Sequence, residues 1–355
     1  MSRLYLRPLG FLYGAAAQNA IADGLALPLA GGPTAFSLAA LIEGTPGNSK
    51  SHLFTVRALA ETRDADLSAL LENVTAERSP FAGLGYDRPI LMGIVNVTPD
   101  SFSDGGLYDT TEEAVRHAAA LAKDGADIVD VGGESTRPGS DAVEVEEERA
   151  RVVPVVQKLK GLKAAISVDT RKSLVARAAA EAGATIFNDV SALTYDRDSL
   201  RVAGENKLDI ILMHAQGEPK TMQDNPTYDD VVLEVYDYLA DRIAAAEAAG
   251  IPGARIAADP GIGFGKTLAH ILTLMASLSI FHGLGVPLLV GASRKRFIGT
   301  AQDGETARDR EPGSHAAAIA AVAQGVQMLR VHDVAGTRQA LKVWQGTTAG
   351  AEKPL

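Results

Sequence analysis

Residues 90–96 have the sequence ILMGIVN, a continuous apolar run that ends in an amide, and this pattern recurs along the chain. Seven further short apolar runs end in polar residues and are separated by helical patterns: DIVDVGG, AAISVD, TIFND, DIILMH, RIAAD, PLLVGAS and MLRVHD. Alternating strands and helices predict a parallel sheet. About eight continuously apolar strands predict that this sheet closes into a (β/α)8 TIM barrel.

The regular pattern starts after a turn with the sequence FAGLGYDRP, at residues 81–89. We therefore expect residues 1–85 to form an accessory segment and residues 86–350 to form the barrel. α/β barrels commonly reach this length as one unit. In the accessory segment, SRLYLR and HLFTVRAL predict strands and DADLSALLENVT predicts a short helix, so we expect an N-terminal α+β extension with a structural role.

The composition excludes several classes of protein. A formal net charge of −10 and a pI near 5.2 oppose binding to nucleic acid or to an anionic membrane, because the summed field repels polyanions. The chain has no cysteine, which excludes disulfides, thiolate catalysis and cysteine-ligated zinc. The apolar stretch AIADGLALPLAGG is interrupted by Asp23 and Pro28 and is too short for a membrane span. We expect a soluble, cytoplasmic protein.

Polar residues stand at the points where the predicted strands end. In such a barrel the carboxyl ends of all strands meet at one mouth, so these residues are expected to converge there: Asn96, Asp130, Asp169, Asn188, His214, Asp259, Ser293, Lys295, Arg330 and His332. One such residue would mean little, because loops begin at strand ends in any fold. Several carboxylates and amides together with cations indicate a binding site.

Several segments carry a specific resemblance. The sequences GIVNVTPDSFSDGG, DIVDVGGESTRPG, ISVDT, FNDVSAL, LMHAQGEPKTMQ, DPGIGFGKT, GASRKRFIG and RVHDV resemble, in the same order, the motifs of the dihydropteroate synthases. The resemblance covers residues 89–345. It implies a magnesium-dependent, homodimeric transferase that joins 4-aminobenzoate to 6-hydroxymethyl-7,8-dihydropterin pyrophosphate. Such an enzyme releases pyrophosphate and makes 7,8-dihydropteroate for folate synthesis.

A pterin needs hydrogen-bond acceptors for its amino and ring N–H groups, and donors for its ring nitrogens and carbonyl oxygen. Four residues at predicted strand ends supply these groups, and the family's pterin contacts map onto the same positions: Asp169, Asn188, Asp259 and Lys295. Met213 is a further candidate, against the face of the ring. The candidate catalytic residues are Asp169, Asp259 and Lys295. The two carboxylates can stabilise positive charge that develops on the pterin methylene.

The pyrophosphate group needs cations and amide donors, which barrels frequently supply from the loops after the last two strands. In this chain those loops contain SRKR, at residues 293–296, and RVHD, at residues 330–333. Arg330 and His332 are two residues apart in a strand-like segment and so point the same way. Ser293 offers a hydroxyl group, and the helix that follows it offers backbone N–H donors. These three residues are the predicted pyrophosphate contacts.

Mg²⁺ is the cofactor that the resemblance implies. In the family, the position of Asn96 contacts the pyrophosphate and its magnesium, and a neutral amide oxygen can share such an ion with phosphate oxygens. The sequence shows no all-protein metal cage. Arg294 and Arg296 fit a solvated basic turn better than a ligand site.

The polar segments after the first two predicted strands, TPDSFSDGG and GGESTRPG, are expected to be mobile covers of the mouth. In the family these two loops close over the bound pterin pyrophosphate. They form the 4-aminobenzoate pocket, with Phe102, Thr136, Arg137 and Pro138 in this chain. The family implies a dissociative reaction, in which the C–O bond to pyrophosphate breaks before the arylamine attacks. The sequence alone also permits direct displacement.

Two other functions fit parts of the sequence. A methyltetrahydrofolate:corrinoid methyltransferase shares the pterin-binding barrel, but it has no use for NVTPDSFSDGG or for cations that hold pyrophosphate. A non-catalytic pterin-binding paralogue would keep the barrel and lose the loops. Both loops and all candidate catalytic residues are present in this chain, which favours the synthase.

Overall fold

The computed structural model describes residues 3–98, 107–135, 139–218, 220–299, 306–307 and 309–349. The candidate 4-aminobenzoate residues Phe102, Thr136, Arg137 and Pro138 lie outside this part of the chain, so their roles stay predictions. No helix among the described residues is long and apolar enough to cross a lipid bilayer.

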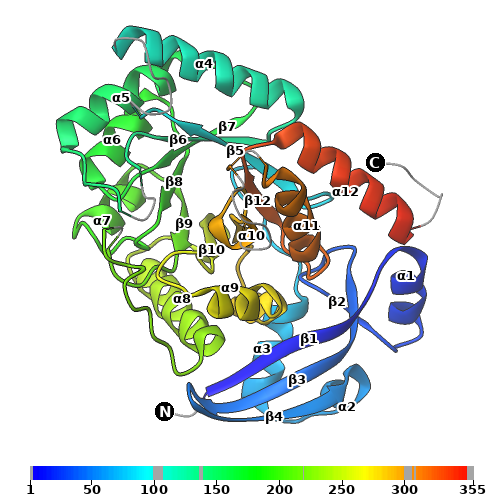
Figure 1. Cartoon of the computed structure of the whole chain (residues 1–355). Helices are drawn as coiled ribbons and strands as arrows, with labels where there is room; N and C mark the ends of the chain where they lie inside the picture. Colours follow the sequence, from blue (N-terminus) through cyan, green and yellow to red (C-terminus); the bar gives the residue numbers. More distant parts are fainter. Residues whose placement is uncertain are drawn as a thin grey trace.

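Eight parallel strands form a barrel, which confirms the predicted fold class (Figure 1). Their order in the sheet is β10-β9-β8-β7-β6-β5-β12-β11. A parallel bridge from Ala258 to Leu288, next to β11, closes the sheet, and the Ala258 N–H donates to the Pro287 carbonyl at 3.0 Å. The strands are β5 (Ile90–Asn96), β6 (Ile128–Gly132), β7 (Ala165–Asp169), β8 (Ile186–Asp189), β9 (Asp209–Met213), β10 (Ile256–Asp259), β11 (Leu289–Val290) and β12 (Met328–Val331).

Helices surround the barrel and alternate with the strands (Figure 1). Asp230 caps α8 by accepting hydrogen bonds from the backbone N–H groups of Val232 and Leu233. Gly183 follows the last residue of α6 and has a φ of 123°, a backbone conformation that residues with a Cβ rarely adopt. The helices are α4 (Leu107–Asp124), α5 (Val145–Lys158), α6 (Ser173–Ala182), α7 (Ser199–Glu205), α8 (Val231–Ala248), α9 (Leu268–Met275), α10 (Arg296–Gly299), α11 (Glu311–Val322) and α12 (Val334–Ala349), with 3-10 helices η2 (Gly253–Arg255) and η3 (Leu278–Leu284).

The inside of the barrel holds its own apolar cluster. Phe81, from the segment before β5, is fully buried in this cluster together with inward-facing strand residues such as Met92 and Ile211. The backbone N–H of Ala82 donates to Asp209 Oδ2 at 2.8 Å. Because Asp209 is the first residue of β9, this segment covers the amino ends of the strands. The carboxyl ends remain as the mouth.

The N-terminal segment forms the predicted α+β extension. Its antiparallel sheet packs the Leu6 and Leu41 face against α2 and α3, through Leu59, Leu67 and Leu70. The proposed boundary at residue 85 stays a prediction. The elements are β1 (Arg3–Leu12), α1 (Gly14–Ala22), β2 (Leu27–Pro28), β3 (Ala35–Thr45), β4 (Asn48–Thr55), α2 (Val56–Ala60) and α3 (Ala65–Thr75).

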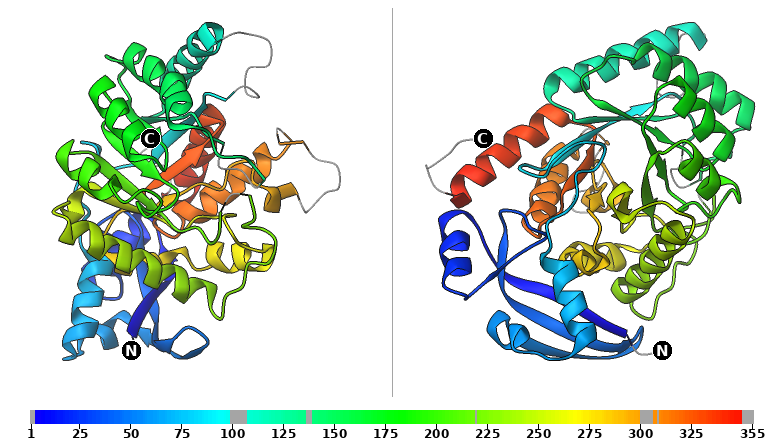
Figure 2. Two further views of the ribbon diagram at one scale, coloured as in Figure 1. Left: turned by 90° about the vertical axis from the view of Figure 1, so that its left-hand side faces the viewer. Right: turned by 180° about the vertical axis from the view of Figure 1, so that it is seen from behind.

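The other face of this sheet packs against the barrel, and the views of Figure 2 show the sheet and α1 alongside it. The ring of Tyr5 contacts that of Tyr236 edge to face, with centroids 5.2 Å apart. Ser279 Oγ donates to the Pro8 carbonyl and Tyr13 Oη donates to the Ala323 carbonyl, each at 2.8 Å. Since η3 and the end of α11 lead into the amino ends of β11 and β12, these two contacts lie at the end of the barrel opposite the mouth.

Candidate active site

Four polar side chains from separate strands meet inside the mouth. Arg330 of β12 donates from Nε to Asp130 Oδ2 at 2.7 Å and from Nη2 to Asp169 Oδ2 at 2.8 Å. Asn188 of β8 donates from Nδ2 to the same Asp130 oxygen at 3.1 Å. The structure therefore brings the predicted pterin contacts Asp169 and Asn188 together with Arg330, which the sequence assigned to the pyrophosphate. Asp130 is the centre of this group.

Burial decides the electrostatics of the Asp130–Arg330–Asp169 group. It raises the pKa of Asp169 to about 7, and the Asp130 carboxylate adds to the rise while Arg330 opposes it. For Arg330, burial acts to lower the pKa, but Asp130 and Asp169 outweigh it and the pKa is raised. One guanidinium thus serves two buried carboxylates. Asp130 Oδ1 and Asp169 Oδ1 have no hydrogen-bond partner among the described residues, so both can accept from ligand N–H groups.

Asp259 and Lys295 form a second group of opposite charges in the mouth. Asp259 ends β10, and its Oδ1 accepts a hydrogen bond from the Gly261 N–H at 2.7 Å. Lys295 Nζ donates to the Ile262 carbonyl and lies 4.6 Å from the ring centre of Phe264. Burial raises the pKa of Asp259, which Lys295 opposes. Burial lowers the pKa of Lys295 to about 8, which Asp259 opposes.

The loop after β10 is built around a buried lysine that the sequence analysis missed. Lys266 Nζ contacts His214 Nδ1 at 2.9 Å and donates to the Phe264 carbonyl at 3.0 Å. Burial and then Lys266 lower the pKa of His214 to about 2, so its imidazole is neutral. Burial also lowers the pKa of Lys266 well below its ordinary value, so this contact joins a neutral imidazole to a buried amino group. In the sequence, Lys266 is the lysine of GKT, at the end of the motif DPGIGFGKT.

Close backbone contact explains a glycine in this loop. Gly261 has a φ of 67°, and a Cβ at this position would lie 1.8 Å from the His214 carbonyl oxygen. The same Cβ would lie 3.3 Å from Cγ of Met213, which ends β9 and is buried. The loop after β10 thus lies directly against the end of β9. Met213 stays a predicted contact to the pterin ring.

The predicted pyrophosphate residues Ser293 and His332 are in contact. Ser293 Oγ lies 3.0 Å from His332 Nδ1 and accepts a hydrogen bond from the His332 backbone N–H at 3.2 Å. These bonds join the loop after β11 to the end of β12. Asn96 ends β5, the strand between β6 and β12. A half-buried amide oxygen at this position fits Mg²⁺, which usually binds only one or two protein oxygens together with phosphate and water oxygens.

A buried ionic network that the sequence analysis also missed lies at the base of the second loop. Glu134 accepts hydrogen bonds from Arg171 and Lys172 and, at 3.3 Å, from the Val143 N–H. Lys172 Nζ also donates to Glu148 Oε2 at 2.5 Å. Glu134 and Val143 flank residues 136–138, so the network fixes both sides of the segment that contains three of the candidate 4-aminobenzoate residues. In the sequence, this network could have been suspected from the two adjacent basic residues of DTRK, Arg171 and Lys172, which follow the third predicted strand.

Comparison with known proteins gives one consistent result. The family model described as pterin binding enzyme matches residues 92–332. The chain is 51% identical to the dihydropteroate synthase of Neisseria meningitidis serogroup C over 265 residues, which are 74% of this chain and 94% of the relative.

Two solved structures are similar as well. A Xanthomonas albilineans dihydropteroate synthase with 4-aminobenzoic acid is 50% identical, with a TM-score of 0.72, and the match covers 77% of this chain and 98% of the other. A Yersinia pestis dihydropteroate synthase in complex with a sulfonamide drug is 43% identical, with a TM-score of 0.71, and covers 75% of this chain and 97% of the other.

Proposed function

The chain belongs to the pterin-binding enzymes, and among them to the dihydropteroate synthases, and we propose that its mouth residues divide the substrate between them. The activity is the transfer of the 7,8-dihydropterin-6-ylmethyl group from its pyrophosphate ester to 4-aminobenzoate. Asp169, Asn188 and Asp259 bind the polar edge of the pterin, Met213 lies against its ring, and Lys295 donates to it. The pyrophosphate is held by Asn96, Ser293, Arg330 and His332.

One observation carries this assignment. Asp130 and Asp169 each keep a buried carboxylate oxygen without a partner among the described residues, beside the amide of Asn188. A buried acceptor that is left unpaired costs roughly 1–3 kcal/mol. The amino and ring N–H groups of a pterin would satisfy both oxygens. Asp130, which the sequence placed at the mouth without a role, therefore joins the proposed pterin contacts.

The reaction needs little covalent chemistry from the protein. The C–O bond to pyrophosphate breaks, its electron pair leaves with pyrophosphate, and positive charge develops on the pterin methylene. The carboxylates of Asp169 and Asp259 face this charge and stabilise it. The amino nitrogen of 4-aminobenzoate then forms the C–N bond and releases a proton.

Magnesium completes the proposal. Mg²⁺ would neutralise charge on the leaving pyrophosphate, with the Asn96 amide oxygen as its protein ligand. We also propose a cytoplasmic location, which cell fractionation would test.

The whole assignment is tested by a coupled assay for pyrophosphate release, which should require both substrates and stop when Mg²⁺ is chelated. Release without 4-aminobenzoate would contradict the transferase assignment.

We expect ordered binding, with pterin pyrophosphate first. If TPDSFSDGG and ESTRPG assemble the arylamine pocket over the bound pterin, then 4-aminobenzoate alone should bind barely at all. Calorimetry should show that 4-aminobenzoate alone gives almost no binding signal, and that sulfonamides bind only when pyrophosphate is bound. Deletion of residues 101–105 should spare the binding of a plain pterin and abolish turnover. Tight sulfonamide binding to the free protein would show a preformed pocket instead.

A homodimer is part of the same proposal, and an apolar groove between α11 and α12 supports it. The groove has a volume of about 470 Å³ and is lined by His315, Ile319, Gly336, Gln339, Ala340, Val343 and Trp344. Val343 is 62% exposed and shares this groove with Ile319 and Trp344, and contiguous exposed apolar surface of this kind marks protein–protein contacts. We propose that a second copy of the chain covers this groove.

Val343→Glu should convert the dimer to a monomer, because a charge would be buried in the apolar interface. Light scattering after size-exclusion chromatography measures the mass. Leu174→Glu is the matched control, since Leu174 on α6 is 51% exposed and lies outside the groove. A Val343→Glu protein that stays dimeric would place the interface elsewhere.

A further inference from the structure

Arg294 lies between two proposed site residues in an unusual backbone conformation. It follows Ser293 and precedes Lys295, and its φ is 58°. A residue with a Cβ pays a free-energy cost for this left-handed conformation, so other contacts must hold it there. The sequence analysis treated Arg294 as part of a solvated basic turn. In the structure only 29% of its side chain is exposed.

The contacts that hold Arg294 come from the start of α11. Its backbone N–H donates to Ser314 Oγ at 2.9 Å, and its carbonyl accepts from Arg310 Nη1 at 3.1 Å. Its Nε donates to Glu311 Oε1 in an ion pair. The backbone N–H, the carbonyl and the guanidinium of one residue are therefore all bound by a single turn of helix, which fixes the direction in which Lys295 leaves the loop.

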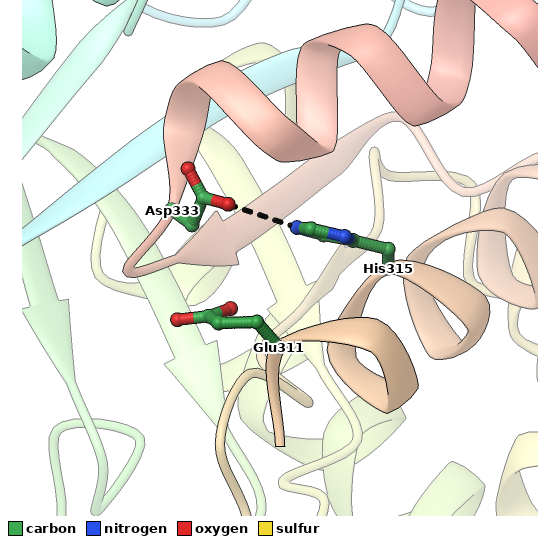
Figure 3. A group of neighbouring side chains, drawn as sticks. All are labelled: Glu311, His315 and Asp333. Atoms are coloured by element: carbon green, nitrogen blue, oxygen red, sulfur yellow. Dashed lines mark hydrogen bonds and ion pairs between the residues drawn. The ribbon is translucent and has the colours of Figure 1, made fainter. Parts of the chain in front are cut away.

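The same end of α11 also contacts the neighbouring loop. His315 Nε2 lies 3.1 Å from Asp333 Oδ2, and Asp333 directly follows His332 (Figure 3). Ligand atoms of Glu311, His315 and Asp333 lie within 4.8 Å of one another, a donor set that a divalent cation could use. However, Glu311 is already paired with Arg294 and Asp333 with His315. The cluster is better explained as two bridges from α11 to the loops after β11 and β12.

We propose that Arg294 and Glu311 are positioning residues for Lys295. The Arg294–Glu311 ion pair holds the strained turn so that the ammonium of Lys295 stays at the Ile262 carbonyl in the mouth and reaches the pterin pyrophosphate. This inference rests on the proposed role of Lys295. It predicts that the ion pair matters for catalysis although neither residue touches substrate.

The test uses two variants of the full-length enzyme. Arg294→Gly removes the guanidinium and keeps the backbone unstrained, because glycine adopts a positive φ freely, and Glu311→Gln removes the partner charge at constant size. Each should lower kcat/KM for pterin pyrophosphate roughly tenfold, as expected for loss of one charge-assisted contact. The Tm of Arg294→Gly should stay near that of the wild type. Glu205→Gln, which breaks the exposed Arg201–Glu205 pair of α7, is the matched control and should change neither quantity.

A double-mutant cycle distinguishes positioning from a general structural role. If Arg294 acts through Lys295, then Arg294→Gly should lower kcat/KM by less than about twofold when Lys295 is already alanine. A full tenfold loss in the Lys295→Ala background would overturn the proposal. Wild-type kinetics in both single variants would also overturn it. Absence of activity in the wild-type enzyme would instead contradict the proposed function.

Discussion

Asp259→Asn is expected to lower turnover about a hundredfold, a typical loss when one charged group that faces a developing charge is removed. Pterin affinity should fall much less, since asparagine keeps the size of the side chain and one acceptor oxygen. The reason is that the negative charge matters most in the transition state, when the methylene becomes cationic. Steady-state kinetics and calorimetry with a plain pterin measure the two quantities separately.

Asp209→Asn provides the control for a half-buried, hydrogen-bonded carboxylate of the same barrel. Asp209 begins β9 and accepts hydrogen bonds from Arg255 and Ala82 at the end opposite the mouth. Its replacement should reduce the Tm and leave turnover unchanged. If Asp259→Asn reduced affinity and turnover by the same factor, the carboxylate would serve binding alone. Asp169→Asn should behave as Asp259→Asn does.

Lys295→Ala is expected to lower kcat/KM for pterin pyrophosphate roughly thirtyfold or more, because a charge-assisted contact contributes on the order of 2 kcal/mol. The fold should stay intact, and the Michaelis constant for the pterin substrate should rise. An unchanged Michaelis constant would contradict this prediction. Lys158→Ala, which removes an exposed lysine paired with Glu112 on the outer helices, should have no effect on either constant.

The pH dependence gives a second measurement on the same residue. Burial lowers the pKa of Lys295 to about 8, so in the free enzyme the ammonium is present below about pH 8 and is lost above it. The kcat/KM of the wild type should therefore decline on the alkaline side of pH 8, and Lys295→Ala should lack this decline. In Asp259→Asn the decline should begin at lower pH, because the Asp259 charge raises the pKa of Lys295.

The strands and their polar ends could be predicted because both follow from local pattern. Apolar runs such as residues 90–96 and 209–213, set between helical patterns, predict buried strands, and the parallel arrangement then places Asn96 and Met213 at one mouth. Partners could not be predicted in this way. The contact between Arg330 and Asp130 joins residues 200 positions apart, and its geometry depends on how the closed sheet brings β6 and β12 to either side of β5.

Arg294 was misread for a related physical reason. A basic residue in a turn is usually solvated, and nothing in SRKR shows that its backbone has a positive φ or that the start of α11 lies against it. Lys266 was overlooked because glycine-rich turns often carry surface lysines. Its burial follows from the close approach of the loop to His214, which only the folded chain reveals.

The contacts between the N-terminal sheet and the barrel affect the order in which the parts of this protein can fold. Ser279 binds the Pro8 carbonyl of β1, and Tyr13, which directly follows β1, donates to the Ala323 carbonyl, so these two contacts join residues 271 and 310 positions apart. Until the barrel is present, the apolar face of β1, with Tyr5, lacks the surface of Tyr236 and Phe281 that covers it. Nascent chains with such distant partners are open to aggregation. We therefore expect the extension to complete its packing only when the barrel residues that cover it are present, and its uncovered face to favour aggregation until then.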